Sequence, residues 1–181
     1  MSKKVLIPLG LLVGAVVIFV IYLAFLSDEI LVREDIRIYG EQGEVQSYLE
    51  DVKNWPLLHL NRPTAINTFS EKTTGPGAWW RQELTSGRFR LMTIESTSLK
   101  DGIKFTIDFG GSSPLNCQMA VRKHLTKGLI FIRSATGKVT FFERMRSHAI
   151  QHAMRLEIYK SNDLLLQKFG GEAIPGQKDV K

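Results

Sequence analysis

The feature that most constrains this chain is an uninterrupted apolar run near its N-terminus. Residues 5–26, VLIPLGLLVGAVVIFVIYLAFL, form a stretch of 22 residues without a charged side chain. A helix of that length crosses the hydrocarbon layer of a bilayer, which is about 30 Å thick. The sequence therefore predicts a transmembrane helix over residues 5–26.

The charges that flank this run predict its orientation. Lys3 and Lys4 precede it, and Asp28 and Glu29 follow it. The positive-inside rule then places residues 1–4 in the cytoplasm and everything after Ser27 on the other side of the membrane. For a bacterial cell, the expectation is a single-pass protein of the inner (cell) membrane with a periplasmic or extracellular C-terminal domain.

A cleaved signal peptide is the alternative to this membrane anchor. The apolar region of such a peptide spans about 7–15 residues and ends in small residues at the cleavage site. Here the run is longer and closes with Tyr22, Leu23, Ala24, Phe25 and Leu26. We therefore expect an uncleaved anchor.

Charge and cysteine content narrow the partners. The net charge is +6, and residues 120–160 carry nine Lys or Arg against two acids. Beside a bilayer, such a basic region suits anionic headgroups better than nucleic acid, although a merely solvated face is also consistent with it. Cys117 is the only cysteine, so no intrachain disulfide is expected. The oligomeric state is left open.

The remaining chain has the pattern of one α+β domain over residues 30–170. Residues 103–109 (IKFTIDF) alternate apolar and polar side chains, and turn pairs such as Asp101-Gly102 separate further strand-like runs. Strands are predicted over 30–39, 65–72, 78–85, 88–96, 103–109, 116–125 and 129–135. A short helix is expected over residues 43–52, and a disordered polar tail over residues 171–181.

A long C-terminal helix is predicted to cover one face of this sheet. Thr140 and Glu143 have the spacing of a capping box, and Gly170-Gly171 marks the end of the helix. We expect an apolar stripe of this helix to face the sheet and a bend or break at residues 161–163. The stripe comprises Phe142, Met145, Ala149, Ala153 and Leu156.

Two motifs carry a resemblance to a known family. The segment DIRIYGEQGEVQSYLEDVKNWP, with Asp51, Asn54, Trp55 and Pro56, and the segment TGPGAWW at residues 74–80 resemble the START-like superfamily, also called SRPBCC or polyketide cyclase/dehydrase-type. The resemblance implies a helix-grip fold, in which a seven-stranded antiparallel sheet wraps around a long C-terminal helix. Together with the N-terminal span, it is similar to the membrane-anchored bacterial members. The family usually has prolines before the first helix, whereas this chain has GEQG at residues 40–43.

The resemblance also implies a cavity between the sheet and the long helix. Trp55, held by Pro56, is expected either to line the mouth of this cavity or to act as an ordinary packing residue. His124, Arg133, His148 or Tyr159 would orient a polar head, and a loop containing Gly110, Gly111 and Pro114 would act as a gate. The pocket candidates are Trp55, Trp80, Phe89, Phe105, Met119, Phe131, Met145, His148, His152 and Tyr159.

Residue patterns that indicate catalysis are weak. His148 and His152 lie four residues apart on the predicted helix, but Ala149 replaces the glutamate of a zinc-protease motif, and no third ligand is fixed. Cys117 lies in a strand pattern that suits a small buried side chain. We therefore expect no metal, no cofactor and no catalytic residue.

The function predicted from these features is binding. The chain would be a membrane-tethered protein that binds a hydrophobic or amphipathic small molecule, such as a lipid, in an SRPBCC-type cavity. Two alternatives remain open at this point: a polyketide cyclase or dehydratase-like enzyme, and a ligand-free protein-interaction module at the membrane.

Overall fold

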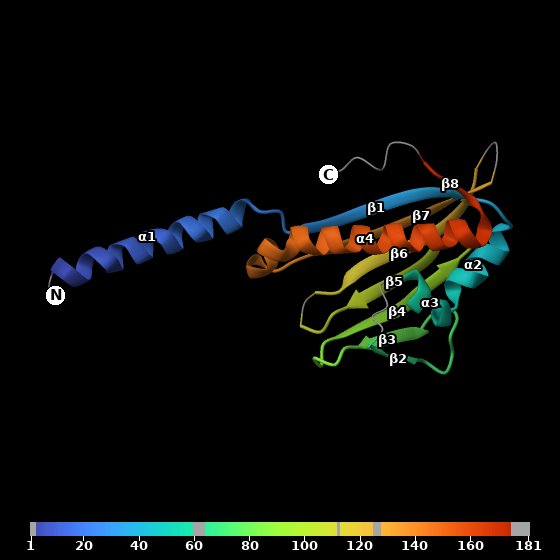
Figure 1. The fold of residues 1–181 in the computed structure, drawn as a ribbon, viewed down its shortest axis with the longest axis horizontal. Coiled ribbons are helices and arrows are strands. Elements are labelled where there is room, and N and C mark those ends of the chain that lie inside the picture. Colours follow the sequence, from blue (N-terminus) through green and yellow to red (C-terminus); the bar gives the residue numbers. More distant parts are fainter. Residues whose placement is uncertain (1–2, 60–63, 112, 125–127, 175–181) are drawn as a thin grey trace.

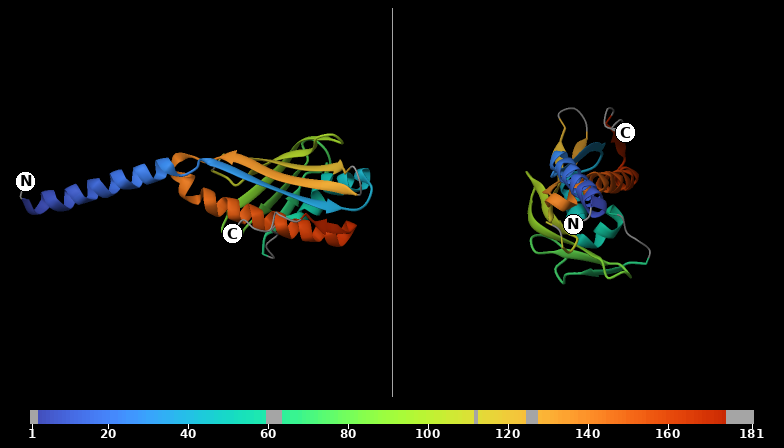
Figure 2. Two further views of the ribbon diagram at one scale, coloured as in Figure 1. Left: turned by 90° about the horizontal axis from the view of Figure 1, so that it is seen from above. Right: turned by 90° about the vertical axis from the view of Figure 1, so that its left-hand side faces the viewer.

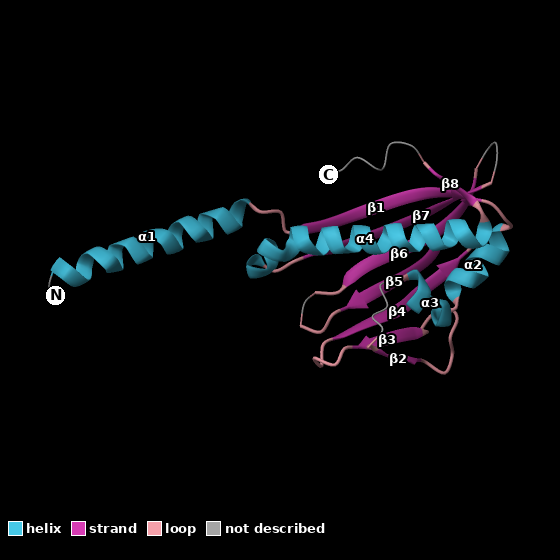
Figure 3. Ribbon diagram, in the orientation of Figure 1, coloured by secondary structure: helices cyan, strands magenta, loops and turns pink. Residues whose placement is uncertain are grey.

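The chain folds into an N-terminal helix followed by a curved antiparallel sheet that one long helix crosses (Figures 1 and 3). The computed structural model describes residues 3–59, 64–111, 113–124 and 128–174, and side chains from residue 11 onward. The helices are α1 (Lys3–Phe25), α2 (Gln42–Glu50), η1 (Val52–Asn54), α3 (Trp55–Leu58), η2 (Phe141–Glu143) and α4 (Arg144–Phe169). The strands are β1 (Glu29–Ile38), β2 (Ile66–Phe69), β3 (Trp79–Glu83), β4 (Phe89–Ser98), β5 (Gly102–Asp108), β6 (Leu115–Lys123), β7 (Leu129–Lys138) and β8 (Gly171–Ala173).

The sheet confirms the expected α+β helix grip, with one strand more than predicted. The strand order is β2-β3-β4-β5-β6-β7-β1-β8, and every pairing is antiparallel. β1 lies between β7 and β8, with Glu29 opposite Lys138 and Ile38 opposite both Leu129 and Gly171. The additional strand, β8, lies at the start of the tail expected to be disordered, and residues 175–181 of that tail lie outside the described residues.

Helix α1 covers most of the run expected to cross a membrane, and it projects away from the sheet (Figure 2). Within the part of the chain that the structure describes, no helix is long and apolar enough to span a bilayer. Residues 5–10 of the expected span lie outside the described side chains. The C-terminal end of α1 contacts the domain, because Leu23 is buried and the Arg144 guanidinium donates to the carbonyl oxygen of Ala24 at 3.2 Å.

Helix α4 begins and ends as predicted. The Glu143 carboxylate accepts hydrogen bonds from the backbone N–H and the hydroxyl of Thr140, at 3.1 and 2.8 Å, and so caps the first turn. Gly170, with φ +72°, follows the last helical residue. The helix runs unbroken through residues 161–163, where a bend or break was expected.

The face that α4 turns toward the sheet is the opposite of the predicted one. Phe142, Met145 and Leu156 are 78%, 54% and 51% exposed, and Ala149 and Ala153 are exposed as well. The buried side chains of α4 are Ser147, Met154, Glu157, Ile158, Ser161, Asn162 and Leu165. The prediction was wrong because it allowed only apolar residues toward the core, whereas ion pairs and hydrogen bonds satisfy the buried Glu157 in this protein.

The Asn54-Trp55-Pro56 segment is helical. A proline disfavours helix at the residue before it, but Trp55 has α-helical angles (φ −64°, ψ −32°) and begins α3. Proline is tolerated in the first turn of a helix because the N–H group it lacks has no partner there. The proline therefore starts a helix here instead of interrupting one.

Gly102, at the start of β5, holds a position that only glycine fits. Its φ is +76°, and a Cβ atom built there would lie 2.1 Å from the Met119 carbonyl oxygen and 2.6 Å from Ala120 Cα. These neighbours are backbone atoms of the paired strand β6, so they cannot move aside as a side chain would. β4 and β5 remain paired as far as this turn. Their pairing contains a register shift between Ile94 and Ser96, which increases the local twist of the sheet.

We expect Gly102→Ala to lower the free energy of unfolding by about 2 kcal/mol or more, measured by urea denaturation. Gly87→Ala is the matched control, because Gly87 has φ +75° but no atom within 4 Å of the position that a Cβ would take. The control shares the left-handed strain, about 1 kcal/mol, without the steric overlap. Equal losses in both variants would contradict the close approach of β5 to β6.

Candidate functional site

The space between α4 and the sheet is filled by large apolar side chains, five of which were predicted to line a pocket. Trp55, Trp80, Phe105, Met119 and Phe131 belong to one core cluster, and each is at most 1% exposed. Trp55 therefore acts as a packing residue in this structure. Whether these five residues contact a ligand remains a prediction.

Trp55 is held at both its ring and its polar edge. Its indole N–H donates to the Leu49 carbonyl oxygen at 2.8 Å, and its ring centroid lies 4.9 Å from that of Phe105. The hydrogen bond ties the end of α2 to α3, and the ring contact ties α3 to the sheet. This arrangement satisfies the one donor that a buried tryptophan carries.

The other five pocket candidates do not point into this interior. Phe89 lies on the opposite side of β4 from buried Met92 and Ile94, with the Arg81 guanidinium 4.6 Å above its ring. Three of the rest, Met145, His148 and His152, are exposed on α4, since α4 presents its other face to the sheet, and Tyr159 lies at the edge of the helix, 36% exposed.

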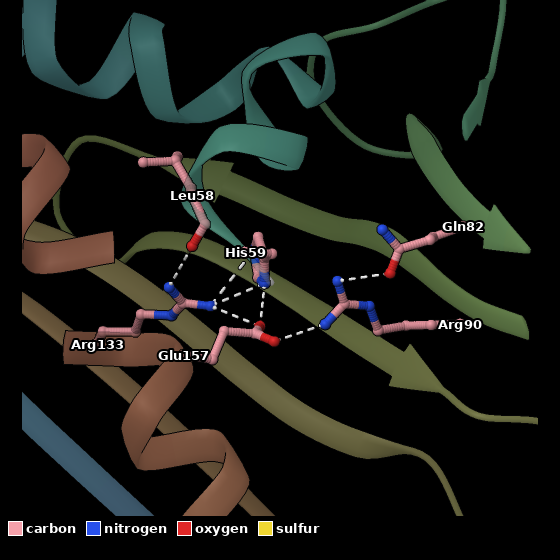
Figure 4. A network of polar contacts seen from close by, with 6 residues as sticks. All are labelled: Leu58, His59, Gln82, Arg90, Arg133 and Glu157. Atoms are coloured by element: carbon pink, nitrogen blue, oxygen red, sulfur yellow. Dashed lines mark hydrogen bonds and ion pairs between the residues drawn. The ribbon is translucent and has the colours of Figure 1, made fainter. Parts of the chain in front are cut away.

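A cluster of charged side chains lies among the buried aromatic residues (Figure 4). We call His59, Arg90, Arg133 and Glu157 the polar cluster. They come from four elements: His59 follows α3, Arg90 is on β4, Arg133 is on β7 and Glu157 is on α4. His59, Arg133 and Glu157 are at most 4% exposed. The cluster thus joins α4, the sheet and the end of α3 at one point.

Glu157 is at the centre of the polar cluster. Its Oε1 contacts His59 Nδ1 and lies 3.4 Å from Arg133 Nη2, and its Oε2 accepts from Arg90 Nη1 at 2.6 Å. Arg133 Nη1 also donates to the Leu58 carbonyl oxygen at 3.1 Å. This one carboxylate therefore joins α4 to two strands and to the end of α3.

The protonation states follow from burial and from these contacts. Burial, and then the neighbouring Arg133, lower the pKa of His59 to about 3, although contact with Glu157 opposes this. Burial alone would raise the pKa of Glu157, but His59, Arg90 and Arg133 outweigh it and hold that pKa below the usual range. An ionised carboxylate only accepts hydrogen bonds, so we assign the proton of neutral His59 to Nδ1, which leaves Nε2 to accept from Arg133 Nη2 at 3.4 Å.

The outer end of the polar cluster approaches the sheet edge formed by β2 and β3. Arg90 Nη2 donates to Gln82 Oε1 at 3.2 Å, and its guanidinium lies 5.0 Å from the centroid of the Trp80 ring. The Trp80 indole N–H donates to Asn67 Oδ1 on β2 at 3.0 Å. The cluster therefore extends from fully buried Arg133 to the partly exposed side chain of Arg90.

The groups in this interior favour recognition of an acceptor over nucleophilic attack. His59, Arg90 and Arg133 all present N–H donors. Burial raises the pKa of the Cys117 thiol to about 12, so it is not a thiolate at neutral pH. Among the described side chains, no three His, Cys, Asp or Glu residues gather closely enough to hold a metal ion.

The gate predicted at Gly110, Gly111 and Pro114 remains a prediction. Ser112, in the middle of this loop, lies outside the described residues. Next to the loop, a cavity of about 20 Å³ lies between Phe109, Leu115 and Ile150 of α4. That volume is about the size needed for one water molecule.

The sequence contained a signal for part of the polar cluster. Arg133 lies two residues from buried Phe131 and two residues from buried Ala135 on β7. Residues two apart on a strand share a face, so strand periodicity places the Arg133 side chain on the inward face. Arg133 is among the head-group contacts predicted from the sequence, whereas Arg90, Glu157 and His59 are not. His59 follows a single turn of helix, where no periodicity predicts the direction of its side chain.

No family model and no curated protein matches this sequence. Solved structures do match. Norcoclaurine synthase from Thalictrum flavum, a point mutant in complex with a transition-state analogue, has a TM-score of 0.58 at 12% identity, over 77% of this chain and 96% of that chain. A protein of unknown function from Staphylococcus aureus has a TM-score of 0.57 at 12% identity, over 77% of this chain and 95% of that one.

A third match is the di-domain ARO/CYC StfQ from the steffimycin biosynthetic pathway. Its TM-score is 0.58 at 9% identity, over 78% of this chain and 51% of that chain. At such low identity the likeness concerns the fold alone. The chain shares the fold of these proteins, an antiparallel sheet with one long C-terminal helix, which agrees with the helix grip that the sequence predicts.

We expect His59 to make this protein sensitive to acid. Unfolded histidine binds a proton below about pH 6.5, whereas buried His59 resists protonation until about pH 3. Between these values the unfolded state binds more protons, so stability falls as the pH is lowered. The equilibrium constant for unfolding of the variant His59→Gln should change less with pH than that of the wild type. The difference between the two proteins should reach up to about tenfold for each pH unit.

Urea denaturation at several pH values between 7 and about 3 checks this prediction. Glu157 also loses stabilisation on acidification, and its pKa depends on His59, so the slopes are compared above about pH 5, where carboxylates are ionised in the folded and the unfolded state. His148→Gln is the matched control, because His148 is exposed on α4, and it should keep the wild-type slope. A His59→Gln slope equal to that of the wild type would contradict a neutral buried His59.

Proposed function

We propose that this protein binds an amphipathic small molecule between α4 and the sheet and is held at a membrane by α1. The observation that carries the proposal is the polar cluster, a set of N–H donors buried inside an aromatic interior. A ligand's apolar body would pack on Trp55, Trp80 and Phe105. Its head, a group that accepts hydrogen bonds such as a carboxylate, phosphate or carbonyl, would bind to Arg133 and Arg90.

The energetics of buried charge support a role beyond packing. Removing charged groups from water costs several kcal/mol each, and well-packed apolar residues often stabilise a core as well or better. The Glu157 carboxylate now takes the position on Arg90 and Arg133 that an acidic or carbonyl head could take. In this proposal Glu157 is the internal counterpart that the ligand head displaces.

The composition of the α4 interface supports such an exchange. Four of the seven buried side chains of α4 are polar: Ser147, Glu157, Ser161 and Asn162. Polar contacts can be exchanged for contacts with water or a ligand head, while apolar contact area is lost outright when a helix moves away. α4 can therefore separate from the sheet at a smaller free-energy cost than a helix with a fully apolar face.

The structural comparisons are consistent with ligand binding. Norcoclaurine synthase, which shares the fold, is seen with a transition-state analogue, and StfQ belongs to a biosynthetic pathway. These findings belong to those proteins and carry over to this chain only as support for the proposal.

The exposed side chains of α1 support the membrane anchor. The apolar residues exposed between Leu11 and Phe25 have exposed fractions of 45% to 86%. A helix that is apolar on all sides is stable only in apolar surroundings. With Lys3 and Lys4 before it, we propose that α1 lies in the inner membrane of a bacterial cell and that the sheet domain is on the periplasmic or extracellular side.

The outward face of α4 favours a second candidate function, that of an interaction module. Phe142, Met145 and Leu156 are exposed there, and the basic residues Arg146 and Lys160 lie beside them on the helix. A partner that fits this surface would be a membrane protein with an apolar, acidic face. The ligand experiment below separates the two candidates.

We expect full-length protein, purified gently from its own membranes, to carry one amphipathic molecule that native mass spectrometry and solvent extraction detect. The double variant Arg133→Met with Glu157→Leu should remain folded, since it replaces one buried charge of each sign with apolar groups and leaves partly exposed Arg90 bonded to Gln82, and it should lose that molecule. Met119→Leu, a conservative change in the same interior, is the control and should retain it.

The outcome decides between the two functions. A wild-type protein that carries no small molecule but copurifies with one membrane protein would contradict ligand binding and favour the interaction module. A molecule that remains bound to a folded double variant would contradict the role of the polar cluster.

We also expect the full-length protein to remain in the membrane fraction after washing at high pH. Val13→Lys with Val17→Lys should release it, because each lysine at the centre of a span costs about 3 kcal/mol. The control Val13→Leu with Val17→Leu keeps the helix apolar and should stay in the membrane. Release of the wild-type protein by the wash would contradict the anchor.

A further inference from the structure

A cavity of about 220 Å³ opens between β1, the C-terminal half of α4 and β8. Figures 1 and 2 show α4 crossing the sheet beside β1, with β8 at the outer edge. The cavity shares none of its lining residues with the polar cluster. Binding in this cavity is therefore independent of the proposed function.

The cavity is acidic. Glu34, Asp35 and Asp163 are among its lining residues. Glu34 is on the inward side of β1, 6% exposed, and accepts a hydrogen bond from the Tyr159 hydroxyl at 3.3 Å. Burial raises the pKa of Glu34, with Tyr159 and the charge of Arg155 acting against that effect. A buried carboxylate of this kind gains from a cation placed beside it.

The described basic side chains near the cavity do not provide Glu34 with a cation in direct contact. Arg33 pairs with Asp35 at 3.1 Å from a side chain that is 61% exposed. Among the described residues, no Lys or Arg forms an ion pair with Glu34 or Asp163. Arg155 acts on the pKa of Glu34 through its charge, without forming an ion pair with it.

Asn162 provides a second, independent sign of a ligand. Its side chain lines the cavity and is 4% exposed, and no described residue forms a hydrogen bond with its Oδ1 atom. Buried acceptors are almost always paired in folded proteins, so one without a partner at the wall of a cavity calls for a donor from outside the chain. Glu34 and Asn162 together present acceptors from both sides, one from the sheet and one from the helix.

The shape and the remaining walls define the ligand. Ile36, Leu166 and Ile174 form an apolar part of the lining, and the volume of about 220 Å³ admits a small organic molecule. An alkylammonium group matches both parts, since it carries one positive charge, three N–H donors and a short apolar chain. A metal ion is a poor match because the described acidic residues do not form a group of metal ligands.

We propose that this cavity binds an alkylammonium group, with the Glu34 carboxylate and Asn162 Oδ1 accepting hydrogen bonds from its nitrogen. The group can come from a free aliphatic amine. It can also come from the chain itself, because Lys178 and Lys181 follow Ile174 closely in the sequence.

The test is a titration of full-length protein in non-ionic micelles with n-pentylamine, followed by NMR through the backbone amide signals of the residues that line the cavity, which every variant retains. 1-Pentanol, a neutral molecule of the same size, corrects for partition into the micelle. We expect saturable shifts with the amine and not with the alcohol. Equal effects of the two compounds would overturn the proposal.

Variants locate the site. Glu34→Gln keeps the shape but removes the charge, and should raise the Kd for pentylamine about tenfold or more. Glu71→Gln, at an exposed position in the loop after β2, is the matched control and should leave the Kd unchanged. Asn162→Asp adds a negative charge and should lower the Kd, a gain that misfolding cannot produce. Unchanged affinity in both cavity variants would overturn the proposal.

The double variant Lys178→Gln with Lys181→Gln distinguishes the two sources. If pentylamine binds this variant much more tightly than the wild type, the occupant is a lysine of the chain itself. If both proteins bind it alike, the ligand is a free amine. Binding to neither protein would overturn the proposal.

Discussion

The contacts of one carboxylate, that of Glu157, join the layers of this domain. Glu157 lies on α4 and contacts His59 after α3, Arg90 on β4 and Arg133 on β7. Breaking such a buried pair by removing one partner typically costs about 3–5 kcal/mol, because the other charge is left unsolvated. The orientation of α4 follows from this constraint, since turning the helix to bury its apolar residues would expose Glu157 and leave two arginines without it.

The same orientation explains why the surface of the protein carries so much apolar area. With its polar face buried, α4 leaves Phe142, Met145 and Leu156 exposed, and α1 exposes apolar side chains on all sides. The two apolar regions are neighbours, because α1 ends beside the start of α4, where Arg144 donates to the Ala24 carbonyl oxygen. The apolar helix α1 and the apolar, basic face of α4 thus meet at one point, which supports the membrane location proposed above.

The sequence predicts the architecture of this protein better than its site. Alternation along β5, the capping box at Thr140 and the glycine after α4 depend on local chemistry, and the structure agrees with each. The sheet's eighth strand is three residues long, too short for periodicity to reveal. Apart from Arg133, the polar cluster could not be predicted, because it depends on charges that meet only in three dimensions and because a buried Glu157 contradicts the apolar rule that predicts helix faces.

The pairing of β1 has a consequence for the order in which the domain is built. β1 is made first, yet both of its neighbours, β7 and β8, come from the last part of the chain. Until they are synthesised, β1 presents two open edges, which can pair wrongly with other chains. Contacts between distant segments also form slowly. The sheet is therefore completed around its first strand only when the C-terminal residues of β8 are available.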